Sequence, residues 1–289
     1  MQIAVTAASG RLGRATLKAL SARVELDRLV AVARRPEAVE MPGLAVRAGD
    51  YASVAGMSSA LDGIDTAVCI SAPVAGGADR LQLHRNVLEA AQAAGVRKVI
   101  YTSVIGNERG AETSFAPFQA INEATEEMLQ RSGLEWIVAR NGLYLDLDIQ
   151  HIRHAQEHGR IYRNNGGAGR CGYISIAELG AALAALATSE LCNGSVLNLV
   201  GELHTQAELV ELVNAAYGLN VRYQPITLEE NVARFMADER IAARGEAVAR
   251  MLSGCFECME RGGFEVSSDF ERATGRPPLS IPEQLATLR

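Results

Sequence analysis

Residues 2–13 read Gln-Ile-Ala-Val-Thr-Ala-Ala-Ser-Gly-Arg-Leu-Gly, a short apolar run followed by a turn that holds Gly10 and Gly13. The apolar run predicts a buried strand, and the residues from Leu12 onward predict a helix. Glycines in such a turn let the backbone approach a diphosphate, while the N-terminus of the helix offers free N–H groups and a positive dipole. A glycine pattern alone is a weak signal, but a strand before it and a helix after it are what a dinucleotide site requires. The alternative is a strand–helix turn that binds nothing.

The turn predicts a set of contacts to a dinucleotide cofactor. The residues that we expect to line it are Thr6, Ala8, Ser9, Gly10, Arg11, Leu12 and Gly13. Ala7 stands where a first glycine is usual. We expect its backbone to keep φ negative, because a positive φ is costly for any residue that carries a Cβ.

The rest of the first half repeats the alternation of strand and helix. We expect strands at residues 2–6, 29–33, 44–47, 66–70, 98–102 and 136–139, and helices at 12–20, 53–61, 79–94 and 118–131. The strands are nearly continuous apolar runs, which is typical of a parallel sheet covered by helices on both faces. The predicted fold class is therefore α/β, a doubly wound parallel sheet of the Rossmann type with a small C-terminal α/β lobe.

The second half is less regular. We expect a helix at 177–187, a strand at 196–200, a capping box from Thr205 to Glu208 that opens a helix, a strand at 221–224 and one long helical stretch over 228–261. Residues 1–145 and 174–200 are predicted to form the cofactor-binding domain, and residues 146–173 and 201–289 the smaller substrate lobe. Such a lobe would cover the open edge of the sheet, where α/β proteins bind ligands.

The residues after the second strand choose between two cofactors. A site for NAD usually has an Asp or Glu about 20 residues beyond the glycine turn, where it holds the ribose hydroxyls. Here the strand runs into Arg34-Arg35-Pro36. A guanidinium group binds a phosphate through paired hydrogen bonds. We therefore predict NADP(H), with Arg34 on the 2′-phosphate and Arg35 or Arg11 assisting, and the alternative is a pair of solvated arginines.

Composition limits the partners. The 289 residues carry a formal net charge of −6 without a long basic run, which argues against a nucleic acid as primary ligand. No apolar stretch approaches the roughly 20 residues that span a bilayer. Five cysteines, an odd number without framework spacing, suit a reducing compartment, so we expect a cytoplasmic protein. The expected partner is a small aromatic molecule, and a homodimer is left open.

Further strings carry a resemblance to a known family. They are Gly49-Asp50-Tyr51, Tyr101-Thr102-Ser103, Ala139-Arg140-Asn141-Gly142-Leu143-Tyr144 and Leu197-Asn198-Leu199-Val200-Gly201. With the glycine turn, they make nearly the whole chain resemble the NmrA-like family of atypical short-chain dehydrogenases, in the branch of NADPH:quinone oxidoreductases and triphenylmethane reductases.

The resemblance implies positions around the cofactor. Asp50 and Tyr51 would lie by the adenine, and Ser71-Ala72-Pro73 would follow the strand beside the ribose. Asn141 and Tyr144 would face the nicotinamide and the substrate cleft, as the catalytic candidates. Further expected cofactor contacts come from Thr102, Ser103 and Asn122. The implied activity is the transfer of hydride from NADPH to a quinone-like or conjugated aromatic acceptor.

One departure from the typical short-chain dehydrogenases bears on the mechanism. Their Tyr-x-x-x-Lys pair aligns here with Phe118 and Asn122. Phenylalanine has no proton to donate, so ordinary carbonyl reduction through that pair is excluded. Quinone-like acceptors are favoured, because solvent can protonate their reduced form. The alternative function is that of other NmrA-like proteins, which bind NADP(H) without turning it over and act as redox sensors.

The remaining candidates are weaker. His151, His154 and His158 share one predicted helix face and could hold a metal, but a polar helix face is the simpler interpretation, and we expect no metal. Cys69, Cys192, Cys255 and Cys258 are interpreted as core residues, with redox chemistry as the alternative for the C-x-x-C of Cys255 and Cys258, whereas Cys171 lies in a predicted glycine-rich loop that could approach the substrate. The candidate walls of the cleft are Phe115, Phe118 and Tyr144, and the alternative is that they are core aromatics.

Overall fold

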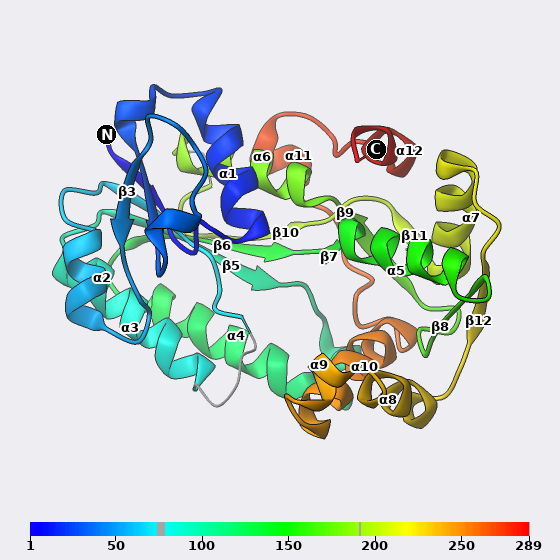
Figure 1. Cartoon of the computed structure of the whole chain (residues 1–289). Helices are drawn as coiled ribbons and strands as arrows, with labels where there is room; N and C mark the ends of the chain where they lie inside the picture. The colour runs from blue at the N-terminus through cyan, green and yellow to red at the C-terminus, as the bar shows by residue number, and fades with distance from the viewer. Residues whose placement is uncertain (74–78, 191, 289) are drawn as a thin grey trace.

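The computed structural model describes residues 1–73, 79–190 and 192–288. Within these residues, seven strands form one sheet in the order β10-β6-β5-β4-β1-β2-β3, and every neighbouring pair is parallel (Figure 1). The strands are β1 (Ile3–Val5), β2 (Leu29–Ala33), β3 (Ala45–Ala48), β4 (Thr66–Cys69), β5 (Lys98–Val104), β6 (Glu135–Asn141) and β10 (Ser195–Leu199). The chain reverses its direction of travel between β1 and β4, and such a switch point is where open α/β sheets bind ligands.

Helices cover both faces of this sheet (Figure 1). One face carries α1 (Arg11–Ser21), α6 (Ile176–Ala187) and α11 (Phe270–Thr274), and the other carries α2 (Val54–Ala60), α3 (Arg80–Ala93) and α4 (Ala116–Gln130). Successive residues of a strand point to opposite faces, so Ile3 and Val5 join the core beneath α1 and α6. Ala4 joins the core beneath α2, α3 and α4. The doubly wound Rossmann-type sheet is confirmed, and the strands and helices predicted for the first half appear with bounds that differ by at most two residues.

The second half of the chain adds two small sheets and a separate core. The three-stranded sheet has the order β11-β9-β7, and the other pairs β12 with β8. These elements are β7 (Leu143–Tyr144), α5 (Leu145–Glu157), β8 (Ile161–Asn164), β9 (Arg170–Ile174), β11 (Leu203–Thr205), α7 (Gln206–Tyr217), β12 (Arg222–Pro225), α8 (Leu228–Met236), α9 (Glu239–Ala242), α10 (Glu246–Glu260) and α12 (Ile281–Thr287). Their apolar side chains form a core that also includes Ile105 and Phe115. The capping box at Thr205 and Glu208 is confirmed at the start of α7.

Two predictions for the second half are wrong. The stretch 228–261 is not one long helix but three, α8, α9 and α10. The Asp238 side chain accepts a hydrogen bond from the Arg240 N–H and starts a new helix, and Gly245 adopts a φ of 88° before α10. Cys171 does not lie in a loop: it is fully buried in β9. The neighbouring glycines serve close packing instead, since a Cβ on Gly172 would lie 2.7 Å from the Val200 Cβ.

The described cysteines are free thiols; Cys69, Cys192 and Cys258 are buried, as predicted, whereas Cys255 is only half-buried. No helix in the described ranges has the length and apolarity needed to cross a membrane.

Candidate functional site

The turn between β1 and α1 is built on close backbone packing. A Cβ on Gly13 would lie 2.6 Å from the Ala7 carbonyl oxygen and 2.8 Å from the Ala8 Cα, so only glycine lets the helix begin this near the strand. Gly10 is the N-cap of α1, and no side chain of the described residues caps it. The first N–H groups of the helix are therefore left for an external acceptor. This cradle fits the diphosphate of a dinucleotide.

The prediction of a negative φ at Ala7 is wrong. Its φ is 48°, in the left-handed region that costs a residue with a Cβ about 1–2 kcal/mol. The physical reason is the turn itself, because the Ala7 carbonyl must face Gly10 to accept its N–H at 2.9 Å. The turn is held to the sheet by a second bond, from the Ala8 N–H to the Val32 carbonyl at 3.1 Å.

Three arginines stand around this turn. Arg34 and Arg35 follow β2 and are exposed, and neither guanidinium has a hydrogen bond or ion pair within the described residues. Arg11 is the first residue of α1, and its Nη2 donates to the Gln150 Oε1 of α5 at 3.3 Å. The edge of the sheet beside β2 is therefore rich in unneutralised positive charge, which suits a phosphate.

Tyr51 ties together the ends of β1 and β4. Its hydroxyl is hydrogen-bonded to the Thr6 Oγ1 and donates to the Ile70 carbonyl at 2.8 Å. Burial raises the pKa of Tyr51, so it stays neutral. Asp50 is exposed, and its Oδ1 accepts the Ala52 N–H at 3.0 Å. The structure thus places both residues near the C-terminal edge of the sheet, Tyr51 half-buried between β1 and β4 and Asp50 at the surface.

Side chains of β5 and α3 form hydrogen bonds with the loop after β4. The Ser71 N–H donates to the Thr102 Oγ1 at 2.9 Å. The Ala72 peptide is held at both ends: its N–H donates to the His84 Nε2 at 2.9 Å, and its carbonyl accepts the Arg80 Nε at 2.7 Å. Pro73 is exposed at the end of this part of the described chain.

Asn122 lies beneath this loop, not at the surface. It is 1% exposed, and its Oδ1 accepts the Arg80 Nη2 at 3.1 Å and the Tyr101 hydroxyl at 2.9 Å. The Arg80 guanidinium sits 4.4 Å above the Phe118 ring. Sequence reasoning missed Arg80 and His84. Their signal was two ionisable residues four apart on the inner face of α3, a face that is otherwise apolar.

A second polar cluster joins β5, β6 and α4. The Arg140 guanidinium donates to the Glu126 carboxylate from its Nε and its Nη2, the shortest distance being 2.7 Å, and Glu126 is 4% exposed. The same carboxylate accepts the Ser103 hydroxyl at 2.5 Å. The cluster fixes the ends of the two strands whose following residues are candidates for the site.

Asn141 ends β6 and lies close to Tyr144, which ends β7. Asn141 is 4% exposed, and its Nδ2 donates to the Tyr144 hydroxyl at 3.5 Å. Its Oδ1 is buried and has no hydrogen-bond partner among the described residues, which leaves one acceptor for a ligand. Burial raises the pKa of Tyr144. A Cβ on the intervening Gly142 would lie 2.5 Å from the Gly172 carbonyl oxygen, so the corner requires glycine.

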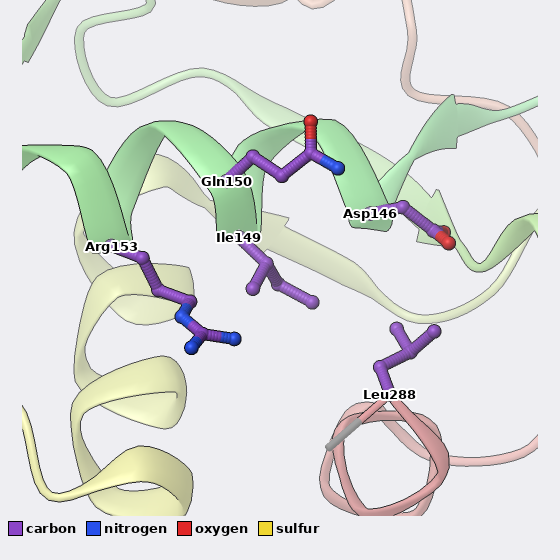
Figure 2. Close-up of a pocket in the computed structure, with 5 residues that line it drawn as sticks. All are labelled: Asp146, Ile149, Gln150, Arg153 and Leu288. Atoms are coloured by element: carbon purple, nitrogen blue, oxygen red, sulfur yellow. The ribbon is translucent and has the colours of Figure 1, made fainter.

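A cavity of about 290 Å³ lies beside α5. Its lining residues, drawn in Figure 2, are Asp146, Ile149, Gln150, Arg153 and Leu288. None of them belongs to the glycine turn or to the Asn141–Tyr144 pair, although Gln150 reaches Arg11. The Asp146 carboxylate also accepts the Ile176 N–H at the start of α6, at 2.8 Å. The polar chemistry described above therefore lies along the edge of the sheet and not in this cavity.

The weaker candidates are placed as follows. The rings of His154 and His158 stack at 3.9 Å, and His151 lies 6.5 Å from the Tyr162 ring. In the part of the chain that the structure describes, no group of three His, Cys, Asp or Glu could hold a metal ion. Phe115 is not a cleft wall: it is 4% exposed and packs against Phe118 and Phe264 in the second core.

Comparisons with known proteins agree with this geometry. A family model described as NAD(P)H-binding matches residues 7–190. Quinone oxidoreductase 2 of Escherichia coli is 30% identical over 99% of this chain and 98% of its own length. The structure of the NADPH-dependent quinone oxidoreductase of Escherichia coli in complex with NADPH superposes with a TM-score of 0.86 at 28% identity, covering 99% of both chains. The Citrobacter sp. triphenylmethane reductase in complex with NADP(H) gives 0.86 at 26% identity, covering 100% of both. The chain belongs to the NAD(P)H-binding family, in its NmrA-like branch.

Proposed function

We propose that this protein is an NADPH-dependent reductase that transfers hydride to a quinone-like or other conjugated aromatic acceptor. One observation carries the proposal: the glycine turn, with its exposed arginines, shares a sheet edge with the Asn141–Tyr144 pair, which has an unused acceptor, the Asn141 Oδ1. Relatives of nearly the same length are described as reductases of quinones and of triphenylmethane dyes.

The cofactor would lie along the C-terminal edge of the sheet. We assign the diphosphate to the turn formed by residues 6–13 and the 2′-phosphate to Arg34, with Arg35 or Arg11 assisting. Asp50 and Tyr51 would lie on the adenine side, residues 71–73 with Thr102, Ser103 and Asn122 on the ribose side, and Asn141 by the nicotinamide. Residues 1–145 and 174–200 would then be the cofactor domain, and residues 146–173 and 201–289 the substrate lobe.

When bound, NADPH supplies the hydride. The protein supplies position and polarity. Phe118 has no ionisable proton, and the Asn122 amide oxygen already accepts hydrogen bonds from Arg80 and Tyr101. Neither side chain can act as the acid of an ordinary ketone reduction. A reduced quinone needs no positioned acid, because conjugation stabilises its oxyanion until solvent protonates it. Tyr144, neutral because burial raises its pKa, is assigned as a wall of the acceptor site.

The test is the consumption of NADPH by the purified protein with and without a panel of quinones and with simple ketones. Rapid oxidation with quinones supports the proposal. Tight binding of both NADPH and NADP⁺ without turnover would instead identify a redox sensor.

We also propose a cytoplasmic location, on the ground that the described cysteines are free thiols, which suit a reducing compartment. A homodimer stays a prediction from the sequence.

A further inference from the structure

Arg80 is a buried cation whose described contacts contain no acid. Arg80 is the first residue of α3 and is only 7% exposed. The Nε donates to the Ala72 carbonyl, and the Nη2 donates to the Asn122 Oδ1. The guanidinium lies over the Phe118 ring, a contact that stabilises a desolvated cation. By contrast, the buried Glu126 forms an ion pair with Arg140.

The third nitrogen of Arg80 is unused. Its Nη1 is buried and has no hydrogen-bond partner among the described residues. Leaving a charged N–H group without an acceptor costs more than about 1–3 kcal/mol, and native structures rarely leave such groups without a purpose. The missing partner is therefore an acceptor from outside the described chain, and a guanidinium N–H calls for an oxygen.

The position of Arg80 in the fold indicates which part of a bound cofactor could supply that oxygen. Arg80 and His84 grip the Ala72 peptide in the loop after β4, and β4 is the neighbour of β1 in the sheet. The glycine turn follows β1, and Asn141 ends β6, which lies two strands from β4 on the other side. Arg80 thus stands between the diphosphate turn and the nicotinamide end of the edge.

His84, which binds the N–H side of the same Ala72 peptide, is the other ionisable residue of this cluster. The His84 Nε2 accepts the Ala72 N–H, so that nitrogen carries no proton, and the Nδ1 lies 2.9 Å from the Thr125 Oγ1. Burial and the charge of Arg80 lower the pKa of His84 to about 3. His84 is therefore neutral near pH 7, and Arg80 is the cation of this cluster.

We propose that Arg80 is a cofactor-binding residue whose Nη1 N–H donates to a ribose hydroxyl on the nicotinamide half of NADP(H), with Asn122 and Phe118 holding the guanidinium in place. This inference rests on the cofactor assignment in the proposed function and is independent of the acceptor. It assigns to α3 a positive charge beside the Phe118–Asn122 pair, where the chain lacks the tyrosine and lysine of ordinary short-chain dehydrogenases.

The test compares two ligands by calorimetric titration. NADPH carries the nicotinamide ribose, and adenosine 2′,5′-bisphosphate does not. Arg80→Gln should weaken NADPH binding about tenfold or more, the loss expected for one hydrogen bond from a charged donor. It should leave the affinity for adenosine 2′,5′-bisphosphate unchanged. The matched control is Arg85→Gln, because Arg85 is exposed on the same helix and should change neither affinity.

Each other outcome overturns the inference. Unchanged NADPH affinity in folded Arg80→Gln would mean that the Nη1 meets only water, and an equal loss for both ligands would mean that Arg80 merely supports the loop. If Arg80→Gln does not give a cooperative thermal transition, Arg80→Lys carries the same test, since it keeps the charge but has a single nitrogen that cannot span the three acceptor positions of the guanidinium. Failure of the unmutated protein to bind NADPH would contradict the proposed function itself, and the first titration would reveal it.

Discussion

The carbonyl oxygen of Ala7 lies 2.6 Å from the point that a Cβ on Gly13 would occupy. The same oxygen accepts the Gly10 N–H, so it cannot move aside without breaking the turn. Ala7 therefore takes a positive φ, and residue 13 must be glycine.

Gly13→Ala should consequently lower the free energy of unfolding by about 1–3 kcal/mol, as overpacking against backbone does. It should also weaken NADPH binding, because α1 must shift away from the diphosphate. Gly10→Ala is the control for stability: its Cβ would lie 3.1 Å from the same oxygen, at an exposed position, so it should lower the free energy of unfolding less. Urea denaturation and titration with NADPH measure both effects. Equal stability of the two variants would contradict this account of the turn.

The strand–turn–helix at β1 and the place of Arg34 and Arg35 after β2 could be predicted from the sequence, because both depend on local signals, namely strand periodicity and glycine spacing. The sign of φ at Ala7 escaped it, since that sign is set by a hydrogen bond across the turn. Cys171 was misassigned for a related reason. Glycines around it were interpreted as a loop, whereas Gly169 and Gly172 let neighbouring backbone and Val200 approach a strand.

The hydrogen bonds of Arg80 and His84 with the Ala72 peptide also could not be predicted, although the three residues lie within one α-helix and the loop before it. Whether these side chains face inward depends on the packing of α3 against α4 and β5, where Asn122 and Tyr101 complete the network. Long-range partners of this kind leave no periodic pattern in the chain. The break of the helical stretch at Gly245 was hidden in the same way by good helix formers on both sides.

Cofactor preference follows from Arg34. We expect NADPH to bind at least tenfold more tightly than NADH, about 1.4 kcal/mol, and Arg34→Ala to remove most of that difference. The physical reason is the loss of a paired hydrogen bond to the 2′-phosphate. Arg23→Ala is a fair control, because Arg23 is exposed beyond the other end of α1. Equal affinity of the unmutated protein for the two cofactors would refute the assignment.

His84 gives a prediction about pH. Its pKa in the folded protein is about 3, below the unfolded value near 6.5, because burial and Arg80 disfavour its cation. The unfolded chain therefore binds the extra proton between these values, so the stability from neutral His84 is complete above pH 6.5 and is lost as pH falls toward 3. The unfolding free energy of the wild type minus that of His84→Gln should fall by up to about 1.4 kcal/mol per pH unit in this window. A difference that does not vary with pH would show that His84 is protonated in the fold.

Tyr144 tests the source of the proton. A positioned acid contributes roughly 10²–10⁴-fold to a rate. If Tyr144 only lines the acceptor site, Tyr144→Phe should change the turnover of quinones by less than roughly tenfold and leave NADPH affinity intact. A hundredfold or greater loss of turnover with intact binding would make Tyr144 the acid and would overturn protonation by solvent. Steady-state kinetics with a quinone, together with an NADPH titration, distinguish the two roles.

The central claim is that this site transfers hydride from its bound cofactor to a quinone-like acceptor, and anaerobic stopped-flow mixing tests it most directly. The protein loaded with NADPH is mixed with a p-quinone, using unlabelled NADPH and the two forms deuterated on either face of the nicotinamide C4. The account predicts rapid loss of NADPH absorbance, slowed by deuterium on one face and not on the other. Bound NADPH that persists unoxidised in the presence of the quinone would contradict it.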